Sequence, residues 1–235
     1  MIKAVCFDLD DTLCNYEKSS RISRRKMFNY AVSKCNGVAW SQLQRAYNEC
    51  LSAMMKEQGG EAVFIRKSGW EVRRELIDRT LRACGINDPP LVKELVELYS
   101  EQRRRTLKLF PDALQVLSSL HDRYPLGLIT NGPSDIQREE ISHLKIQEYF
   151  DHITVSGEVG YAKPDPRIFQ LAVAKFHLFP PEVLYVGNSQ ETDVAGAHGA
   201  GLKVAWLNRK DETLRSGIPK PHHEIKSLLK RLDLL

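Results

Sequence analysis

Two carboxylates stand two residues apart where an apolar run near the start of the chain ends. Residues Ile2 to Leu9 are almost all apolar, which is typical of a strand buried on both faces of a parallel sheet. Side chains alternate along a strand, so Asp8 and Asp10 should leave on one side and Leu9 on the other. Two close carboxylates repel each other unless a cation or a shared proton intervenes. The pattern indicates a divalent metal site with one carboxylate free to attack or to transfer a proton, although such acids also begin ordinary turns.

Two further polar groups follow predicted strands or open predicted helices. The run Thr130-Asn131-Gly132 closes the predicted strand 126–130 and offers a hydroxyl, an amide and flexible backbone to an anion. Lys163 stands between rigid turns just before a predicted helix, where its ammonium and the helix dipole would both attract phosphate. In isolation, the pattern of the first group favours an ordinary strand-to-helix turn, and most lysines are solvated.

The last group follows the predicted strand 183–186. Asn188 and Asp193 could point oxygens at a metal or hold its ligands, and the alternative is an Asx turn with a helix start. Gly196 and Gly199 would let the following helix pack closely on the sheet. Because ligand sites of parallel sheets lie beyond the carboxyl ends of the strands, we expect all these groups to share one site.

The elements that must position these groups are predicted from periodicity. From Phe110 onward helices alternate with strands at 126–130, 153–155, 183–186 and 203–207, and a closing helix is expected at 225–232. Ser134 and Gln137 have the spacing to cap the helix after the second strand. This alternation predicts an α/β fold, a Rossmann-like doubly wound parallel sheet.

A helical insertion interrupts that fold. Between about residues 17 and 106 the sequence shows successive amphipathic helices, with breaks near 36–37, 58–60 and 85–88. Asp88 followed by Pro89 suits a helix N-cap and first position. We expect a core domain of residues 1–16 and 107–235 and a helical-bundle cap of residues 17–106.

Composition excludes several classes of protein. The chain has 235 residues and a net charge of +4, which is ordinary for a globular protein and too modest to indicate a nucleic-acid partner. No apolar stretch is long enough to cross a membrane, and no signal peptide is visible. The five cysteines form no Cys-x-x-Cys pair, which favours reduced thiols in the cytoplasm. A monomer and a homodimer remain equally compatible with the sequence.

The four groups, in this order, resemble the four motifs of the haloacid dehalogenase superfamily of phosphotransferases. The resemblance covers nearly the whole chain and rests on Phe7-Asp8-Leu9-Asp10-Asp11-Thr12-Leu13, Ile129-Thr130-Asn131-Gly132, Lys163-Pro164, and Gly187-Asn188-Ser189 through Asp193. The helical insertion is similar to the cap of the subfamily that carries its cap after the first motif. Local runs around these motifs look closest to pyrimidine nucleotidase-like and acylneuraminate-phosphatase-like members.

This resemblance implies an enzyme that hydrolyses the phosphomonoester of a small metabolite, such as a nucleotide or a sugar phosphate. It implies that Asp8 is the nucleophile and Asp10 the general acid and base. It further implies Mg²⁺ as cofactor, held by the Asp8 carboxylate, the Asp10 carbonyl and Asn188, with Thr12 and Asp193 behind these ligands. The phosphoryl group would be held by a set of four residues, Thr130, Asn131, Gly132 and Lys163.

Asn188 departs from the phosphatase pattern, which normally has an acid there. A neutral ligand should weaken magnesium binding, so we expect a working enzyme with a high magnesium requirement. A 2-haloacid dehalogenase is an alternative, because those enzymes carry Asn in this motif, but they lack an acid at the position of Asp10. A catalytically weakened binding protein is another alternative.

Basic runs at 18–26 and 103–105 motivate a non-enzymatic binding module. We expect their charges to face solvent from helices, and cap Arg or Lys residues could instead meet an anionic substrate.

Overall fold

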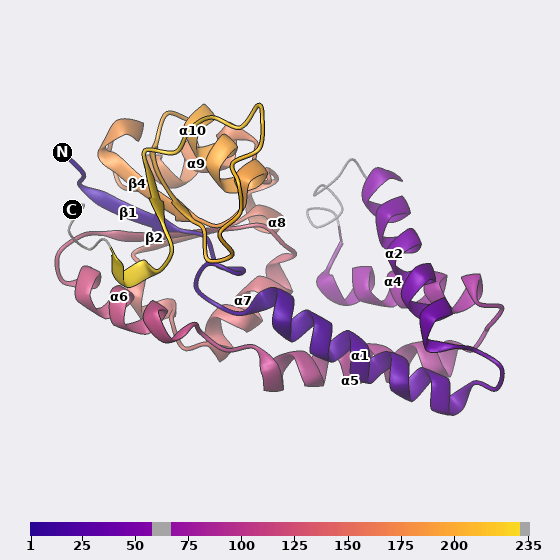
Figure 1. The fold of residues 1–235 in the computed structure, drawn as a ribbon. Helices are drawn as coiled ribbons and strands as arrows, with labels where there is room; N and C mark the ends of the chain where they lie inside the picture. The colour runs from indigo at the N-terminus through magenta and orange to yellow at the C-terminus, as the bar shows by residue number, and fades with distance from the viewer. Residues whose placement is uncertain (58–66, 231–235) are drawn as a thin grey trace.

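The computed structural model describes residues 1–57 and 67–230, and it has two lobes (Figure 1). One lobe contains a sheet with helices on both faces, and the other is built from helices alone. The strands are β1 (Ala4–Phe7), β2 (Leu126–Thr130), β3 (His152–Val155), β4 (Val183–Gly187), β5 (Lys203–Leu207) and β6 (His223–Ile225). The helices are α1 (Tyr16–Lys34), α2 (Trp40–Glu57), α4 (Gly69–Ala83), α5 (Pro89–Thr106), α6 (Pro111–His121), α7 (Ser134–His143), α8 (Ser156–Val159), α9 (Pro166–Ala174) and α10 (Gly196–Gly199), with shorter turns η2 (Gln147–Tyr149), η3 (Pro180–Glu182) and η4 (Gln190–Ala195, a π-helix).

The sheet is parallel throughout the described residues, in the order β3-β2-β1-β4-β5-β6. β1 is central, and alternate residues of this strand pack into different cores. Val5 and Phe7 join the cluster beneath α6, whereas Ala4 and Cys6 join the cluster beneath α9 and α10. A strand that buries both faces must be apolar at every position, which explains its unbroken apolar run. The predicted α/β doubly wound fold is confirmed.

The helical lobe consists of α1, α2, α4 and α5 around a third apolar cluster that includes Met27, Leu81 and Leu95. Asp88 caps α5 as expected, since its carboxylate accepts the Leu91 N–H at 3.0 Å and Pro89 opens the helix. These helices occupy the range expected for the cap, and the break expected at 58–60 lies outside the described residues. The division into two domains stays a prediction.

The closing helix expected at 225–232 is wrong within the described residues. Ile225 instead ends strand β6, where it lies opposite Leu207 and accepts the Asn208 N–H at 2.8 Å. Pairing with β5 satisfies backbone groups that a helix at this edge would leave unpaired. Ile225 and Leu228 are both buried in the core, but Ile225 belongs to a strand and only residues 228–230 form a single 3-10 turn.

Among the described residues, no helix combines the length and apolarity needed to span a membrane. All five cysteines are free thiols. Burial raises the pKa of the Cys6 thiol to about 12, which makes it inert as a nucleophile. The cytoplasmic location and the oligomeric state stay predictions.

Gly196 and Gly199, both expected to let α10 pack closely, have different surroundings in the structure. A Cβ on Gly196 would lie 2.9 Å from the backbone Cα of Pro164 and 2.8 Å from the Phe169 ring, whereas a Cβ on Gly199 would meet nothing within 4 Å. Gly196 is therefore closely packed as expected, but against Pro164 and α9 and not against the sheet, and the expectation is wrong for Gly199.

We expect Gly196→Ala to lower the free energy of unfolding by about 1–3 kcal/mol through overpacking. Gly199→Ala, on the same helix, should leave the stability unchanged or raise it by up to about 1 kcal/mol. Chemical denaturation of both variants measures this, and equal effects at the two positions would contradict the packing described.

Candidate active site

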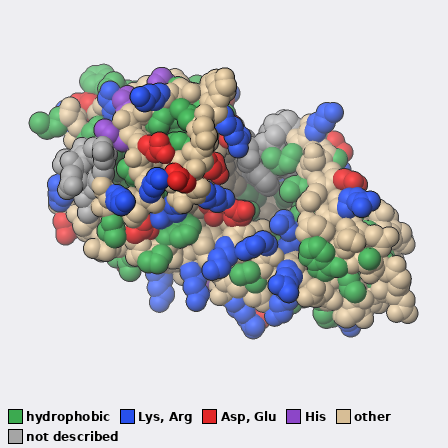
Figure 2. Space-filling view, in the orientation of Figure 1, with side chains coloured by type: hydrophobic (Ala, Val, Ile, Leu, Met, Phe, Trp, Pro, Cys, Tyr) green, Lys and Arg blue, Asp and Glu red, His purple; other side chains and the backbone are tan. Residues whose placement is uncertain are grey.

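A cavity of about 620 Å³ opens at the carboxyl ends of β1, β2 and β4, between the sheet and the helical lobe. Figure 2 shows the molecule hollowed between the two lobes, with basic side chains gathered along the lower helices in that view. Eight of the predicted site residues line this cavity, and they are Asp8, Asp10, Thr130, Asn131, Gly132, Lys163, Asn188 and Asp193. Thr12 is fully buried behind them. The roles expected for these residues stay predictions, but the structure brings the groups together.

The Lys163 ammonium lies at the centre of the site. Its Nζ is 2.6 Å from Asp8 Oδ1 and 2.7 Å from Asp193 Oδ1, and it donates to the Tyr185 hydroxyl at 3.0 Å. Asp193 also accepts the Tyr185 hydroxyl at 2.8 Å and the Ser189 N–H at 2.9 Å. All three charged residues are at most 4 % exposed. Buried charges of this kind are stable only when paired, so these residues fix one another's positions.

Burial and charge act in opposite directions on this group. Burial raises the pKa of the Asp8 carboxyl to about 6, although the charge of Lys163 lowers it. Burial also disfavours the charged form of Lys163, but Asp193 and Asp8 outweigh it and hold the pKa of the ammonium above its ordinary value. Lys163 is therefore a permanent cation beside the Asp8 oxygens.

Asp10 has different surroundings from Asp8. Burial, reinforced by the negative charges of Glu140 and Asp8, raises the pKa of the Asp10 carboxyl well above its ordinary value. Gln137 Nε2 donates to Asp10 Oδ2 at 3.5 Å. The two neighbouring carboxyls thus favour different protonation states, with Asp8 the more readily ionised and Asp10 the more readily protonated.

Asn188 is held by two elements. Its side-chain oxygen accepts the Thr12 hydroxyl at 3.0 Å, and its backbone oxygen accepts Trp206 Nε1–H at 2.9 Å. Asn188 lines the cavity, and its amide oxygen has a second lone pair beyond the one that accepts from Thr12.

The donor set available to a metal consists of oxygens. Within residues 1–57 and 67–230, no group of three acidic, histidine or cysteine side chains could hold a metal ion. Mg²⁺ needs only one or two carboxylates, since it keeps several waters and takes substrate oxygens. Asp8, the Asp10 carbonyl and Asn188 therefore fit this ion, with one formal charge fewer than a site with a second carboxylate.

The turn after β2 is tightly bonded. Thr130 Oγ1 donates to Gln137 Oε1 at 2.7 Å, and the Asn131 side chain bonds both the N–H and the carbonyl of Lys163 at 2.8 and 2.9 Å. Gly132 has a φ of 146° and donates its N–H to Ser156 Oγ at 2.9 Å. The expected cap of Ser134 and Gln137 on α7 is wrong, because Gln137 bonds Thr130 instead and no side chain caps that helix. This turn holds Lys163 in place.

Sequence reasoning missed a buried ion pair beneath the site. Arg103 Nη2 on α5 lies 2.9 Å from Glu140 Oε1 on α7, and both residues are at most 5 % exposed. The Arg103 guanidinium also lies 4.0 Å from the centroid of the Tyr16 ring and donates to the Tyr16 carbonyl at 3.0 Å. The expectation that the run 103–105 faces solvent is therefore wrong for Arg103, since the helix turns it toward the core lobe.

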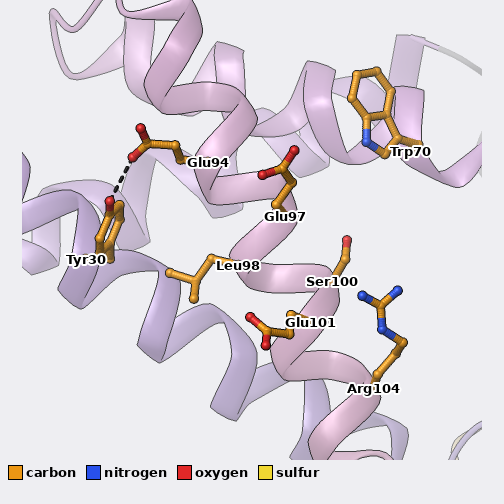
Figure 3. Close-up of a pocket in the computed structure, with 8 residues that line it drawn as sticks. All are labelled: Tyr30, Trp70, Glu94, Glu97, Leu98, Ser100, Glu101 and Arg104. Carbon is orange, nitrogen blue, oxygen red and sulfur yellow. Dashed lines mark hydrogen bonds between the residues drawn. The ribbon is translucent and has the colours of Figure 1, made fainter.

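A second hollow lies on the helical lobe (Figure 3). Its side chains come from α1, α4 and α5, and the Tyr30 hydroxyl donates to Glu94 at 2.8 Å. None of its lining residues belongs to the site at the strand ends. Arg104 lines it together with three glutamates, but its ion pair is with Glu139 outside the hollow, so we assign the hollow no part in catalysis.

Comparison with known proteins places this geometry in a family. The chain matches the model of the haloacid dehalogenase-like hydrolases over residues 5–207. It is 30% identical to a glyceraldehyde 3-phosphate phosphatase of Methanopyrus kandleri, over 100% of this chain and 97% of the relative. It is also 30% identical to the N-acylneuraminate-9-phosphatase of Homo sapiens, over 100% of this chain and 94% of the relative.

A solved 2-haloacid dehalogenase from Pseudomonas syringae pv. Tomato DC3000 is similar in structure, with a TM-score of 0.72 and 26% identity over 97% of this chain and 95% of that one. The chain therefore belongs to the haloacid dehalogenase-like hydrolase family. The expected enzyme class, a hydrolase of phosphoric monoesters, is confirmed by its phosphatase relatives, and so is the resemblance to acylneuraminate phosphatases.

The Arg103–Glu140 pair has a matched control on the same two helices. Arg104 and Glu139 also lie 2.9 Å apart across α5 and α7, but both are exposed. We expect Arg103→Met to lower the free energy of unfolding by about 3–5 kcal/mol, because it leaves a buried carboxylate unpaired, and Arg103→Met with Glu140→Leu to recover most of that loss. Arg104→Met should cost less than about 1 kcal/mol. Chemical denaturation compares the variants, and a similar loss for Arg103→Met and Arg104→Met would refute this account.

Proposed function

We propose that this protein is a magnesium-dependent phosphomonoester hydrolase that acts on a small phosphorylated metabolite through a phosphoryl group carried on Asp8. One observation carries the proposal. Within a single cavity, Asp8 lies 2.6 Å from a permanent ammonium and beside a second carboxyl, Asp10, that favours its protonated form. We propose further that residues 17–106 form the cap domain, which excludes water from the first step, and that the enzyme works in the cytoplasm.

The first step is attack by an Asp8 oxygen on phosphorus. A carboxylate and a phosphate dianion repel each other, so a cation must screen both, and Lys163 is placed to do so. As the new oxygen–phosphorus bond forms, the ester bond breaks and Asp10 gives its proton to the leaving oxygen. The raised pKa of Asp10 ensures that it holds this proton beforehand.

The second step returns the enzyme to its starting state. Asp10, now ionised, takes a proton from a water that attacks phosphorus, and the bond from phosphorus to Asp8 breaks. Inorganic phosphate leaves, Asp8 is again a carboxylate, and Asp10 is again protonated. Thr130, Asn131 and Gly132 would orient the phosphoryl group, with the Asn131 side chain holding Lys163 in register.

Asp8, the Asp10 carbonyl and Asn188 would hold Mg²⁺. When bound, this ion would supply positive charge to the phosphoryl oxygens. Thr12 keeps the Asn188 oxygen oriented, and Asp193 fixes Lys163, so each acts through another residue.

A dehalogenase is the second candidate, and Asn188 is the observation that favours it. The dehalogenase fold neighbour shows that this architecture serves both reactions. Asp10 favours the phosphatase. When Asp8 displaces a halide from a haloacid, the leaving halide needs no proton, whereas the leaving oxygen of a phosphate ester does.

We expect Asp8→Asn to reduce phosphate release from p-nitrophenyl phosphate by at least about a thousandfold, because an amide is no nucleophile. The variant should still fold, since Lys163 keeps Asp193 as a partner. Asp122→Asn, at an exposed position after α6, is the control and should retain activity.

Steady-state phosphate release and circular dichroism of both variants make this measurement. Chloride release from 2-chloropropionate by the unaltered protein, without phosphate release from the ester, would instead favour the dehalogenase.

We expect Asn188→Asp to lower the magnesium concentration for half-maximal activity by about tenfold, because a carboxylate adds a formal charge to the site. Activity measured against Mg²⁺ concentration at fixed ionic strength tests it. An unchanged or higher magnesium requirement would show that residue 188 is not a ligand.

A further inference from the structure

The helical side of the active-site cavity carries its own positive charge. Arg24 on α1 and Arg73 on α4 both line the cavity that contains Asp8 and Lys163. Both are half-buried, in contrast to their exposed neighbours Arg25 and Arg74. These arginines therefore belong to the interior of the site.

A buried tyrosine holds each of these guanidinium groups. Arg24 Cζ lies 5.3 Å from the centroid of the Tyr47 ring, and Arg73 Cζ lies 5.3 Å from that of Tyr99. Arg73 also donates from Nη1 to Ser100 Oγ at 3.1 Å. Stacking on an aromatic face attracts a cation and restricts its rotation, while its remaining N–H groups stay free to bond a ligand.

Both arginines lie close enough to the Tyr47 hydroxyl to act on it electrostatically. Burial raises the pKa of the Tyr47 hydroxyl, and the charges of Arg24 and Arg73 each act to lower it. Tyr47 comes from α2 and Tyr99 from α5, so each of the four helices of this lobe contributes at least one polar group to the same wall.

Most carboxylates near this wall have other partners. Within the described parts of the chain, neither Arg24 nor Arg73 lies in an ion pair with an acidic side chain. Glu17, which also lines the cavity, pairs with Lys210, and Glu140, which feels the charge of Arg73, pairs with Arg103. Asp8 and Asp193 share Lys163. Among the others that line the cavity, Asp11 accepts the Glu17 N–H and the Asp10 carboxyl favours its protonated form. Two partly desolvated cations without a carboxylate partner attract an anion from solution.

We propose that Arg24 and Arg73 form an anion-binding subsite, and that the substrate carries a second anionic group on the leaving part of the molecule. This proposal rests on the proposed function, because it assumes that the phosphoryl group lies at Asp8. The second group is a carboxylate or a second phosphate. Met27, Leu76 and Ile77 line the space beside the arginines and would contact the carbon skeleton between the two anions.

Matched ester pairs test the subsite. We compare 3-phosphoglycerate with glycerol 3-phosphate, which lacks the carboxylate, and fructose 1,6-bisphosphate with fructose 6-phosphate, which lacks the second phosphate. In at least one pair, the unaltered enzyme should prefer the ester that carries the second anionic group, by about tenfold or more in kcat/KM. The pair that shows the preference identifies the second anion.

Variants assign the preference to the arginines. Arg24→Gln and Arg73→Gln should each lower kcat/KM for the preferred ester by about tenfold or more, through KM, and change it far less for its partner that lacks the second anion. The controls Arg25→Gln and Arg74→Gln should stay within about twofold for both esters. Equal losses on both members of a pair, or no preference in the unaltered enzyme, would overturn the subsite while leaving phosphatase activity intact.

Binding separates the two proposals. Calorimetry measures the affinity of the Asp8→Asn chain, with and without Arg24→Gln, for 3-phosphoglycerate and fructose 1,6-bisphosphate. This measurement tests the subsite without turnover. If no ester is hydrolysed but Arg24→Gln still weakens binding about tenfold, the proposed function fails and the anion site stands. If neither ligand responds to Arg24→Gln, the anion site fails.

Discussion

The active site depends on one buried ammonium placed between two carboxylates. Lys163 brings positive charge to Asp8, and Asp193 keeps Lys163 in place when the Asp8 oxygens are engaged elsewhere. None of the three would be tolerated at this depth alone, because an unpaired buried charge is expensive. Their mutual pairing stabilises an ionised carboxylate at the end of a buried strand, as the nucleophilic role proposed for Asp8 requires.

The rest of the molecule positions this group. β1 carries Asp8, β4 carries Tyr185 and leads into Asn188 and Asp193, and the bonded turn after β2 holds Lys163 through Asn131. Packing of Gly196 against Pro164 keeps α10 close to the segment that contains Lys163. The helical lobe is tied to the core by the Arg103–Glu140 pair and by the Gly69 N–H, which donates to Asp135 at 2.8 Å.

Much of the architecture could be predicted from the sequence, because a strand buried on both faces is apolar at nearly every position. Strands 126–130 and 203–207 have the bounds predicted for them. The spacing of Ile225 and Leu228 is compatible with either a helix or a strand. Pairing with the edge of β5 determines that Ile225 lies in a strand. A short edge strand carries too little pattern to be distinguished locally.

The site was predictable in its composition but not in its contacts. Residues that end strands can be placed at one edge by topology alone, so the gathering of Asp8, Lys163 and Asp193 could be foreseen. Arg103 could not, because it sits in a run of three arginines and only the packing of α5 on α7 shows which one is buried. The spacing of Gln137 from Ser134 predicts a helix cap. Its actual bond to Thr130 crosses a turn, and no spacing rule predicts the geometry of that turn.

The most direct test of this account is to trap the phosphoryl group on the enzyme. The unaltered protein is mixed with excess ester and magnesium, quenched in acid during turnover and reduced with borohydride, and the N-terminal peptide is examined by mass spectrometry. The account predicts that residue 8 alone is converted to homoserine, because an acyl phosphate is reduced and a free carboxylate is not. An unaltered Asp8 under conditions where phosphate is being released, or a label on another residue, would contradict the central claim.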